Sequence, residues 1–319
     1  MEKYKVLITG GHGFIGCHIA NNLNAKGYTV GVIDNYTDYK CYDKKEYKRV
    51  IKQRIEHANS ASLCASIFDS EGTFKFFKPD IVIHLASCPN ARMLLRNVEQ
   101  ETTTAIDGTL KILQLCVKYK VKRIVFASSS MVYGNFMSDA PDEFHPTDPK
   151  TLYGSYKLAG EQMIKTFNKD YGLEYCILRP SAIYGTRDMI IRVISQMAKS
   201  MFEKGEIIIT GAKSKLDFTY VTEVAEAFVQ GAVHKGATNM VFNCSRGRGR
   251  TIIEAADLVK DYMGTGVCAT NIKESDSFYP SRDTLDSSRL KTLTGWEPKI
   301  DIEEGIKKYV EWFKENYIL

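Results

Sequence analysis

The chain has 319 residues, of which 44% are hydrophobic and 25% are charged, and its formal net charge is +5 at pH 7. These fractions are ordinary for a soluble globular protein and leave room for one large α/β domain or two smaller ones. No apolar run reaches membrane-spanning length, and the mild positive charge suits an anionic ligand without requiring nucleic acid.

The first predicted elements are a strand, a glycine-rich turn and a helix. Tyr4–Ile8 is a short apolar run typical of a buried strand, and the apolar face of His18–Leu23 has helical spacing. Between them stands Thr9–Gly16, in the context that a dinucleotide-binding fingerprint needs. Its glycines would allow a tight turn and close approach of a pyrophosphate, and the helix N-terminus would face the phosphates.

The second predicted strand, Thr29–Ile33, is followed by an acid, Asp34. This acid stands at the distance from the glycines at which a carboxylate binds the ribose 2′-hydroxyl of a dinucleotide. A 2′-phosphate would meet its negative charge. The sequence therefore favours NAD over NADP.

Strands and helices continue to alternate up to about residue 180. A charged helix is expected before His57, and further helices at Glu71–Phe77, at Val98–Tyr119 and from Tyr153 to about Asp170. The further strands are predicted at Ser62–Ile67, Ile81–Ala86, Val121–Ala127 and Tyr175–Leu178. This alternation predicts a Rossmann-type, doubly wound parallel sheet, whose ligands bind beyond the carboxyl ends of the strands. The glycine turn, His84–Ser87 and Ser128–Ser130 all lie at such ends.

Tyr153 and Lys157 are four residues apart, so they share one face of their predicted helix. A tyrosine phenol has a pKa of about 10 and is a poor base at neutral pH. A lysine ammonium one turn away, together with a nicotinamide cation, would favour the phenolate. Such a tyrosine could take the proton from a substrate hydroxyl as hydride leaves the carbon, with a serine at the end of the preceding strand holding the same oxygen.

The pattern loosens after Ala182, where short helices, a strand at Ile207–Ile209 and glycine-rich loops alternate. We predict an NAD-binding Rossmann domain at residues 1–180, to which a segment at about 217–238 returns. Residues 181–216 and 239–319 would form a smaller α/β substrate-binding domain. The eight cysteines show no Cys-x-x-Cys pair or metal-like spacing. We therefore expect reduced core thiols in a cytoplasmic protein, with no signal peptide before the first strand and no bound metal.

The motifs together resemble those of extended short-chain dehydrogenases/reductases, and more narrowly the NAD-dependent nucleotide-sugar epimerase/dehydratase family. The resemblance covers essentially the whole chain, including Gly295–Lys299 near its end. The motifs that carry it are Thr9–Gly16, Asp34-Asn35, His84-Leu85-Ala86, Ser128-Ser129-Ser130-x-Val132-Tyr133-Gly134, Tyr153-x-x-x-Lys157, Leu178-Arg179-Pro180 and Tyr184-Gly185.

The resemblance implies roles for individual residues. Tyr153 would be the general base and acid, Lys157 would orient the nicotinamide ribose and lower the tyrosine pKa, and Ser129 matches the catalytic Ser/Thr. The implied NAD-binding residues are Gly10, Gly13, Phe14, Ile15, Gly16, Asp34, Asn35, Tyr36, Ser66, Ile67, Leu85, Ala86, Ser87, Ala127, Ser128, Tyr153, Lys157 and Pro180. The implied substrate-binding residues are Ser129, Ser130, Met131, Tyr153, Ala182, Arg187, Arg192 and Lys215. A homodimer would form through the helices at about 98–119 and 152–170.

The sequence departs from the family pattern mainly where the substrate diphosphate would bind. Ala182 and Leu216 replace an Asn and an Arg that usually hold it, and Ser66 and Ala105 replace an Asp and an Asn near the cofactor. The cations that we regard as candidate replacements are Arg187, Arg192, Lys215, Arg246, Arg248, Arg250 and Arg282. The short Arg-Gly-Arg-Gly-Arg run at 246–250 lacks a recognition fold, so we expect no nucleic-acid partner.

The residues after the catalytic serine narrow the reaction. A 4,6-dehydratase would carry Asp-Glu there and a 3,5-epimerase would need Cys and His, whereas this chain has Ser130-Met131, which cannot do that acid–base work. Oxidation at C4 of a nucleotide-linked sugar remains. The chain would be a 4-epimerase if hydride returns to the other face, or a dehydrogenase if a keto sugar, GDP-linked for instance, is released. A catalytically silent NAD-sensing protein on the same fold is a further alternative.

Overall fold

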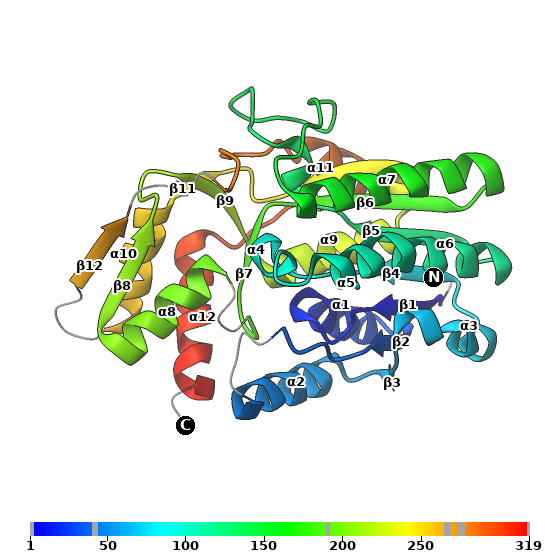
Figure 1. Ribbon diagram of the computed structural model, residues 1–319, viewed down its shortest axis with the longest axis horizontal. Helices are drawn as coiled ribbons and strands as arrows, with labels where there is room; N and C mark the ends of the chain where they lie inside the picture. The colour runs from blue at the N-terminus through cyan, green and yellow to red at the C-terminus, as the bar shows by residue number, and fades with distance from the viewer. Residues whose placement is uncertain (1–2, 40–43, 189–191, 265–268, 274–277, 318–319) are drawn as a thin grey trace.

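A seven-stranded parallel sheet forms the larger part of the molecule in the computed structural model, which describes residues 3–39, 44–188, 192–264, 269–273 and 278–317 (Figure 1). The strand order is β10-β6-β5-β4-β1-β2-β3, and each neighbouring pair is parallel. The strands are β1 (Lys5–Thr9), β2 (Thr29–Asp34), β3 (Ala61–Cys64), β4 (Ile81–His84), β5 (Arg123–Ala127), β6 (Glu174–Pro180) and β10 (Met240–Cys244). The predicted doubly wound sheet is confirmed.

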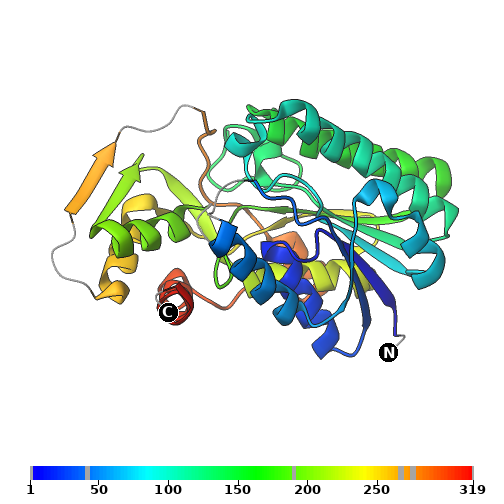
Figure 2. The same ribbon diagram turned by 60° about the horizontal axis from the view of Figure 1, so that its bottom comes forward.

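Apolar cores lie on both faces of this sheet because successive side chains of a strand point to opposite sides. In β1, Val6 and Ile8 pack on one face and Leu7 on the other. The first face is covered by α1 (Phe14–Ala25) and α9 (Val221–Val233), with α2 (Lys44–Ala58) against α1. The second is covered by α3 (Glu71–Phe77), α6 (Gly108–Lys118) and α7 (Leu152–Tyr171), and Figure 2 shows the sheet between the two layers.

The predicted long helix at 98–119 is present in three parts. It consists of α5 (Val98–Thr102), a π-helical segment at Thr103–Asp107, and α6. A short helix, α4 (Ala91–Leu94), precedes it. π-helical turns widen a helix locally and occur frequently at functional sites.

A smaller unit stands beside the carboxyl ends of the sheet strands (Figure 1). Its own apolar core lies between helices and two small sheets. The helices are α8 (Val193–Lys204), α10 (Ile252–Met263) and α12 (Ile302–Tyr317), and the strands are β7 (Ala182–Tyr184), β8 (Glu206–Thr210), β9 (Lys215–Tyr220), β11 (Gly249–Thr251) and β12 (Ala269–Lys273). A further helix, α11 (Ser288–Thr294), packs against β10.

The second predicted boundary between the domains differs from the structure. We assigned everything from residue 239 to the smaller domain, but β10 pairs with β6 in the large sheet. Within the predicted return segment, α9 packs against α1 whereas β9 pairs with β7 and β11 of the smaller unit. The division of the chain into two domains stays a prediction.

Six cysteines lie in the part of the chain that the structure describes, and all six are free thiols. Five are buried, as expected for core thiols, but Cys64 is exposed because β3 is the edge strand and all its residues face solvent. Cys41 and Cys268 lie outside the described residues. Among the described helices none is long and apolar enough to cross a membrane.

Candidate active site

The glycine turn between β1 and α1 leaves room that any side chain would fill. Gly10 has a φ of +68°, and a Cβ there would lie 3.0 Å from the backbone of Ala86. A Cβ on Gly16 would lie 2.5 Å from the carbonyl oxygen of Gly10. Gly13 is the N-cap of α1 and gives it no side-chain cap, so the N–H groups of the first turn are left for a ligand. The turn therefore fits the pyrophosphate of a dinucleotide.

Asp34, at the end of β2, lines the cavity into which the glycine turn faces. Its carboxylate accepts hydrogen bonds from the backbone N–H groups of His12 (3.0 Å) and Tyr36 (2.9 Å), one on each oxygen. The His12 imidazole in turn lies 3.0 Å from the Tyr36 hydroxyl. These contacts fix the carboxylate at the cavity wall, where each oxygen keeps a lone pair for a ribose hydroxyl.

One cavity of about 350 Å³ gathers every residue that we expected to bind NAD. It lies across the carboxyl ends of β1, β2, β4 and β5, where a doubly wound sheet binds its ligands. The hydroxyl of one of these residues, Ser128, already has a partner within the protein, because it donates to Glu161. Glu161 in turn forms a buried ion pair with Arg179 at 2.6 Å. This network explains the Leu178-Arg179-Pro180 motif as support for the strand ends.

Ser129, Tyr153 and Lys157 meet at the opposite end of the cavity. Ser129 follows β5, and α7 begins at Leu152 behind the N-cap Thr151. The Ser129 hydroxyl lowers the pKa of the Tyr153 phenol, and the Lys157 ammonium lies 5.7 Å from the centre of the tyrosine ring. The helix N-terminus can approach the serine turn because Gly154 has no side chain, and a Cβ there would lie 2.6 Å from the Met131 carbonyl oxygen.

Burial and charge act in opposite directions on the Tyr153 phenol. Burial is the largest effect and keeps the pKa above its usual value, whereas the positive charges of Arg192 and Arg282 and the Ser129 hydroxyl lower the pKa in part. Burial also lowers the pKa of Lys157 to about 8. The sequence suggested the lysine as the group that favours the phenolate, whereas the positive charges that lower the pKa of Tyr153 in the structure come from Arg192 and Arg282.

The predicted substrate residues divide into two groups. Ser129, Met131, Tyr153 and Arg192 line the cavity. The residues outside its wall are Ser130, Ala182, Arg187 and Lys215.

Each residue of the second group has another place in the structure. Lys215 is exposed and pairs with Asp283 at 3.3 Å, and the Arg187 guanidinium donates to the Thr186 hydroxyl. Ser130 is buried, and Ala182 lies in β7. The prediction of direct substrate contact therefore finds no support in the structure for these four residues.

The remaining candidate arginines lie mostly outside the cavity. Arg246 pairs with Asp301 and Arg250 with Glu303, each at 2.6 Å, and Arg248 is exposed. Arg282 alone of this group lines the cavity, where it donates to the Ser130 hydroxyl at 2.9 Å.

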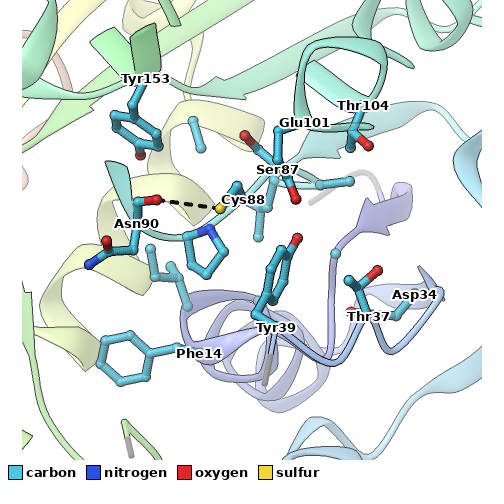
Figure 3. Close-up of a pocket in the computed structure, with 18 of the residues that line it drawn as sticks. Phe14, Asp34, Thr37, Tyr39, Ser87, Cys88, Asn90, Glu101, Thr104 and Tyr153 are labelled. Atoms are coloured by element: carbon cyan, nitrogen blue, oxygen red, sulfur yellow. Dashed lines mark hydrogen bonds between the residues drawn. The ribbon is translucent and has the colours of Figure 1, made fainter. Parts of the chain in front are cut away.

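Several cavity residues were missed by the sequence reasoning, and Figure 3 shows some of them around the central space. They include Tyr39, Cys88, Asn90, Glu101, Thr104 and Tyr279. The Glu101 side chain is only 5% exposed, its Oε2 is buried without a hydrogen-bond partner, and burial raises its pKa. No pattern in the sequence separated Glu101 from the solvated acids of the same helix, whereas Cys88 directly follows the predicted Ser87.

The described residues contain no group of three or more His, Cys, Asp or Glu side chains able to hold a metal.

Residues 6–245 match the model of the NAD dependent epimerase/dehydratase family. The chain is 34% identical to a putative UDP-glucose 4-epimerase of Methanocaldococcus jannaschii, over 98% of this chain and 99% of the relative.

Solved structures show the same likeness. The UDP-glucose 4-epimerase of Thermotoga maritima with UDP-glucose has a TM-score of 0.87 at 30% identity, and the match covers 98% of this chain and 99% of the other. The UDP-glucose 4-epimerase of Thermus thermophilus in complex with NAD has a TM-score of 0.84 at 26% identity, covering 97% and 99%.

Proposed function

The chain belongs to the NAD dependent epimerase/dehydratase family, and we propose that it is a nucleotide-sugar 4-epimerase that uses NAD. The observation that carries the proposal is the meeting of Ser129, Tyr153 and Lys157 at one end of a cavity whose other end is formed by the glycine turn and Asp34. This arrangement suits removal of a proton and a hydride from one carbon of a bound sugar.

Two parts of the cavity wall would bind the cofactor. The first turn of α1 would face the pyrophosphate, and Asp34 would accept a hydrogen bond from a ribose hydroxyl. Bound NAD supplies an acceptor for the hydride of C4. A Glu101 carboxylate without a partner on one oxygen gives the same cavity a further acceptor for ligand hydroxyls.

Tyr153 is the proposed base for the C4 hydroxyl. Burial holds its pKa above the usual value, and the charges of Arg192 and Arg282 and the Ser129 hydroxyl offset part of this rise, so these groups would favour the phenolate that takes the proton. Ser129 would hold the same oxygen. If the oxidised sugar turned its other face before the hydride returned to C4, Tyr153 would give the proton back to the C4 oxygen and the sugar would leave inverted at C4.

The neighbours of the serine exclude two related reactions. Ser130 and Met131 are both buried, and neither can move a proton at C5 or C6 as a 4,6-dehydratase requires. An epimerisation at C3 and C5 needs groups that deprotonate carbon, and these two side chains do not supply them. Chemistry at C4 alone is what the site supports.

The test is incubation of the protein and NAD with UDP-glucose, UDP-galactose, UDP-N-acetylglucosamine and UDP-glucuronate, followed by NMR identification of the products. A C4 epimer without net NADH establishes the proposal. NADH that accumulates with a released keto sugar makes the protein a dehydrogenase. Binding of NAD and sugar nucleotide without any product supports the silent sensing protein.

A homodimer and a cytoplasmic location belong to the same proposal. The helices expected at the interface carry large apolar side chains that are exposed in the single chain, namely Val98, Leu110 and Leu152. Apolar residues of this kind are the usual centre of a contact between copies. Sedimentation velocity should show a dimer, and Leu110→Asp should shift it toward the monomer.

A further inference from the structure

Arg282 places a positive charge in the cavity, and the part of the chain that the structure describes supplies no carboxylate paired with it. Its Nη1 donates to the Ser130 hydroxyl at 2.9 Å, and its Nε is buried without a hydrogen-bond partner. Among the described residues no carboxylate forms an ion pair with Arg282. Arg192, the other arginine that acts on Tyr153, is neutralised by Asp188 at 2.9 Å.

The acid next to Arg282 in the chain is engaged elsewhere. Asp283 pairs with Lys215 at 3.3 Å and accepts a hydrogen bond from the Thr284 hydroxyl at 3.2 Å. Burial lowers the pKa of the Arg282 guanidinium to about 10. A guanidinium that has left water without a counter-charge is costly, and a bidentate carboxylate offsets this cost better than any neutral group.

The segment that carries Arg282 is fastened over the cavity by contacts on both sides. The Arg92 guanidinium lies 4.7 Å from the ring centre of Phe278 and 5.6 Å from that of Tyr279. The Ser281 N–H donates to Asn135 at 2.9 Å, and the Ser281 carbonyl accepts from Phe136 at 3.0 Å. The free charge is therefore held in place before a ligand arrives.

The position of Arg282 points to the sugar rather than to the nucleotide. It contacts Ser130, the neighbour of Ser129, and its charge acts on the Tyr153 phenol. If C4 of the sugar lies at that phenol, the substituent of C5 is its close neighbour. The diphosphate is attached to C1, on the opposite side of the ring from C4.

We propose that the substrate sugar carries a carboxylate on C5, as in a uronic acid, and that Arg282 binds this carboxylate. The proposal rests on the proposed C4 chemistry and names the class of sugar on which it acts. Arg282 is then a specificity-determining residue. A neutral hydroxymethyl group at the same place would leave the guanidinium without a counter-charge.

The experiment is calorimetric titration of the NAD-saturated protein with UDP-glucuronate, UDP-glucose and UDP. Binding is the readout because loss of Arg282 also raises the pKa of Tyr153 and would slow turnover of any sugar. We expect the wild-type protein to bind UDP-glucuronate about tenfold or more tightly than UDP-glucose, as a hydrogen bond to a charged group allows. Arg282→Gln should abolish this preference and leave the affinities for UDP-glucose and UDP within about twofold.

Two further variants complete the design. Arg282→Lys keeps a charge but not the planar fork and should retain part of the preference. Arg248→Gln removes an exposed arginine outside the cavity and should change none of the affinities. Circular dichroism of each variant confirms that it is folded.

Two outcomes would overturn the proposal. In the first, wild-type protein binds UDP-glucuronate no more tightly than UDP-glucose, a comparison that needs no variant. In the second, Arg282→Gln weakens UDP-glucose and UDP as much as UDP-glucuronate, which would assign the guanidinium to the diphosphate. Selective binding of UDP-glucuronate without epimerisation would instead contradict the proposed function and leave the carboxylate site standing.

Discussion

The two ends of the cavity are built in different ways. The end with the glycine turn comes from strand ends in the first part of the chain, and its main groups are backbone atoms and one acid, Asp34. The end with Tyr153 combines the serine turn, the start of α7, Arg192 and the segment at 279–282. Parallel strands fix the first end, whereas docked loops complete the second.

This difference in construction indicates that the sugar end of the cavity can change while the cofactor end stays the same. The sheet and the glycine turn support each other, so a change there disturbs the whole fold. The segment with Arg282 is held by a cation–π contact from Arg92 and by loop hydrogen bonds, which can be replaced without altering the sheet. A cofactor can therefore be kept while the sugar changes.

The largest effect is expected at the sugar end of the cavity, at Tyr153. Tyr153→Phe removes the proposed base but keeps the ring, so turnover should fall by about 10³-fold, within the range for loss of a general acid–base. Binding of NAD should be unchanged in calorimetry. Tyr156→Phe, which removes a hydroxyl of the same helix that bonds Thr102, is the matched control. Full activity of Tyr153→Phe would contradict the mechanism.

Gly16→Ala tests whether the cofactor end depends on backbone contact. The added methyl group would lie 2.5 Å from the Gly10 carbonyl oxygen, so we expect the free energy of unfolding to fall by about 1–3 kcal/mol. NAD binding should weaken with it. Gly72→Ala in α3 meets no atom within 4 Å and should be neutral or stabilising by about 0.5–1 kcal/mol. Equal stability of the two variants in urea would show that the turn tolerates side chains.

Asp34→Ala sharpens the comparison because it removes the carboxylate that would bind the ribose at the cofactor end. Loss of a hydrogen bond to a charged group should weaken NAD about tenfold and relax the discrimination against NADP. The affinities for both dinucleotides are measured by fluorescence titration. Asp38→Ala removes a neighbouring, exposed carboxylate outside the cavity wall and serves as the control. An unchanged preference for NAD would mean that Asp34 does not bind the ribose.

The sequence predicted the cofactor end better than the sugar end for a physical reason. Gly10, Asp34 and Ala86 follow or end strands, so the parallel register that places the strands also places them. Arg282 reaches Ser130 across 152 positions of the chain through loops with no periodic pattern. Lys215 carries the same charge and lies outside the cavity, and the sequence contains no signal that separates the two.

The last expected effect is on stability and concerns Lys157, which lies at the same end of the cavity as Tyr153. Its pKa falls from 10.5 to about 8 through burial, so without NAD the folded protein holds fewer protons than the unfolded chain between these values. The free energy of unfolding should therefore rise with pH across this range. Below about pH 8 the lysine is charged in the folded protein too, and the buried charge lowers the free energy of unfolding by its full amount.

Lys157→Met isolates this contribution, because the other titrating groups are the same in both proteins. In urea unfolding without NAD, the variant should be more stable than the wild type at neutral pH by at most about 3 kcal/mol, which is what a fall of the pKa from 10.5 to about 8 is worth. The advantage should shrink as the pH approaches 10.5. A difference that stays constant with pH would show that the ammonium is not destabilised in the fold. A shrinking difference would show that the site keeps a costly charge for its chemistry, as stability–activity trade-offs require.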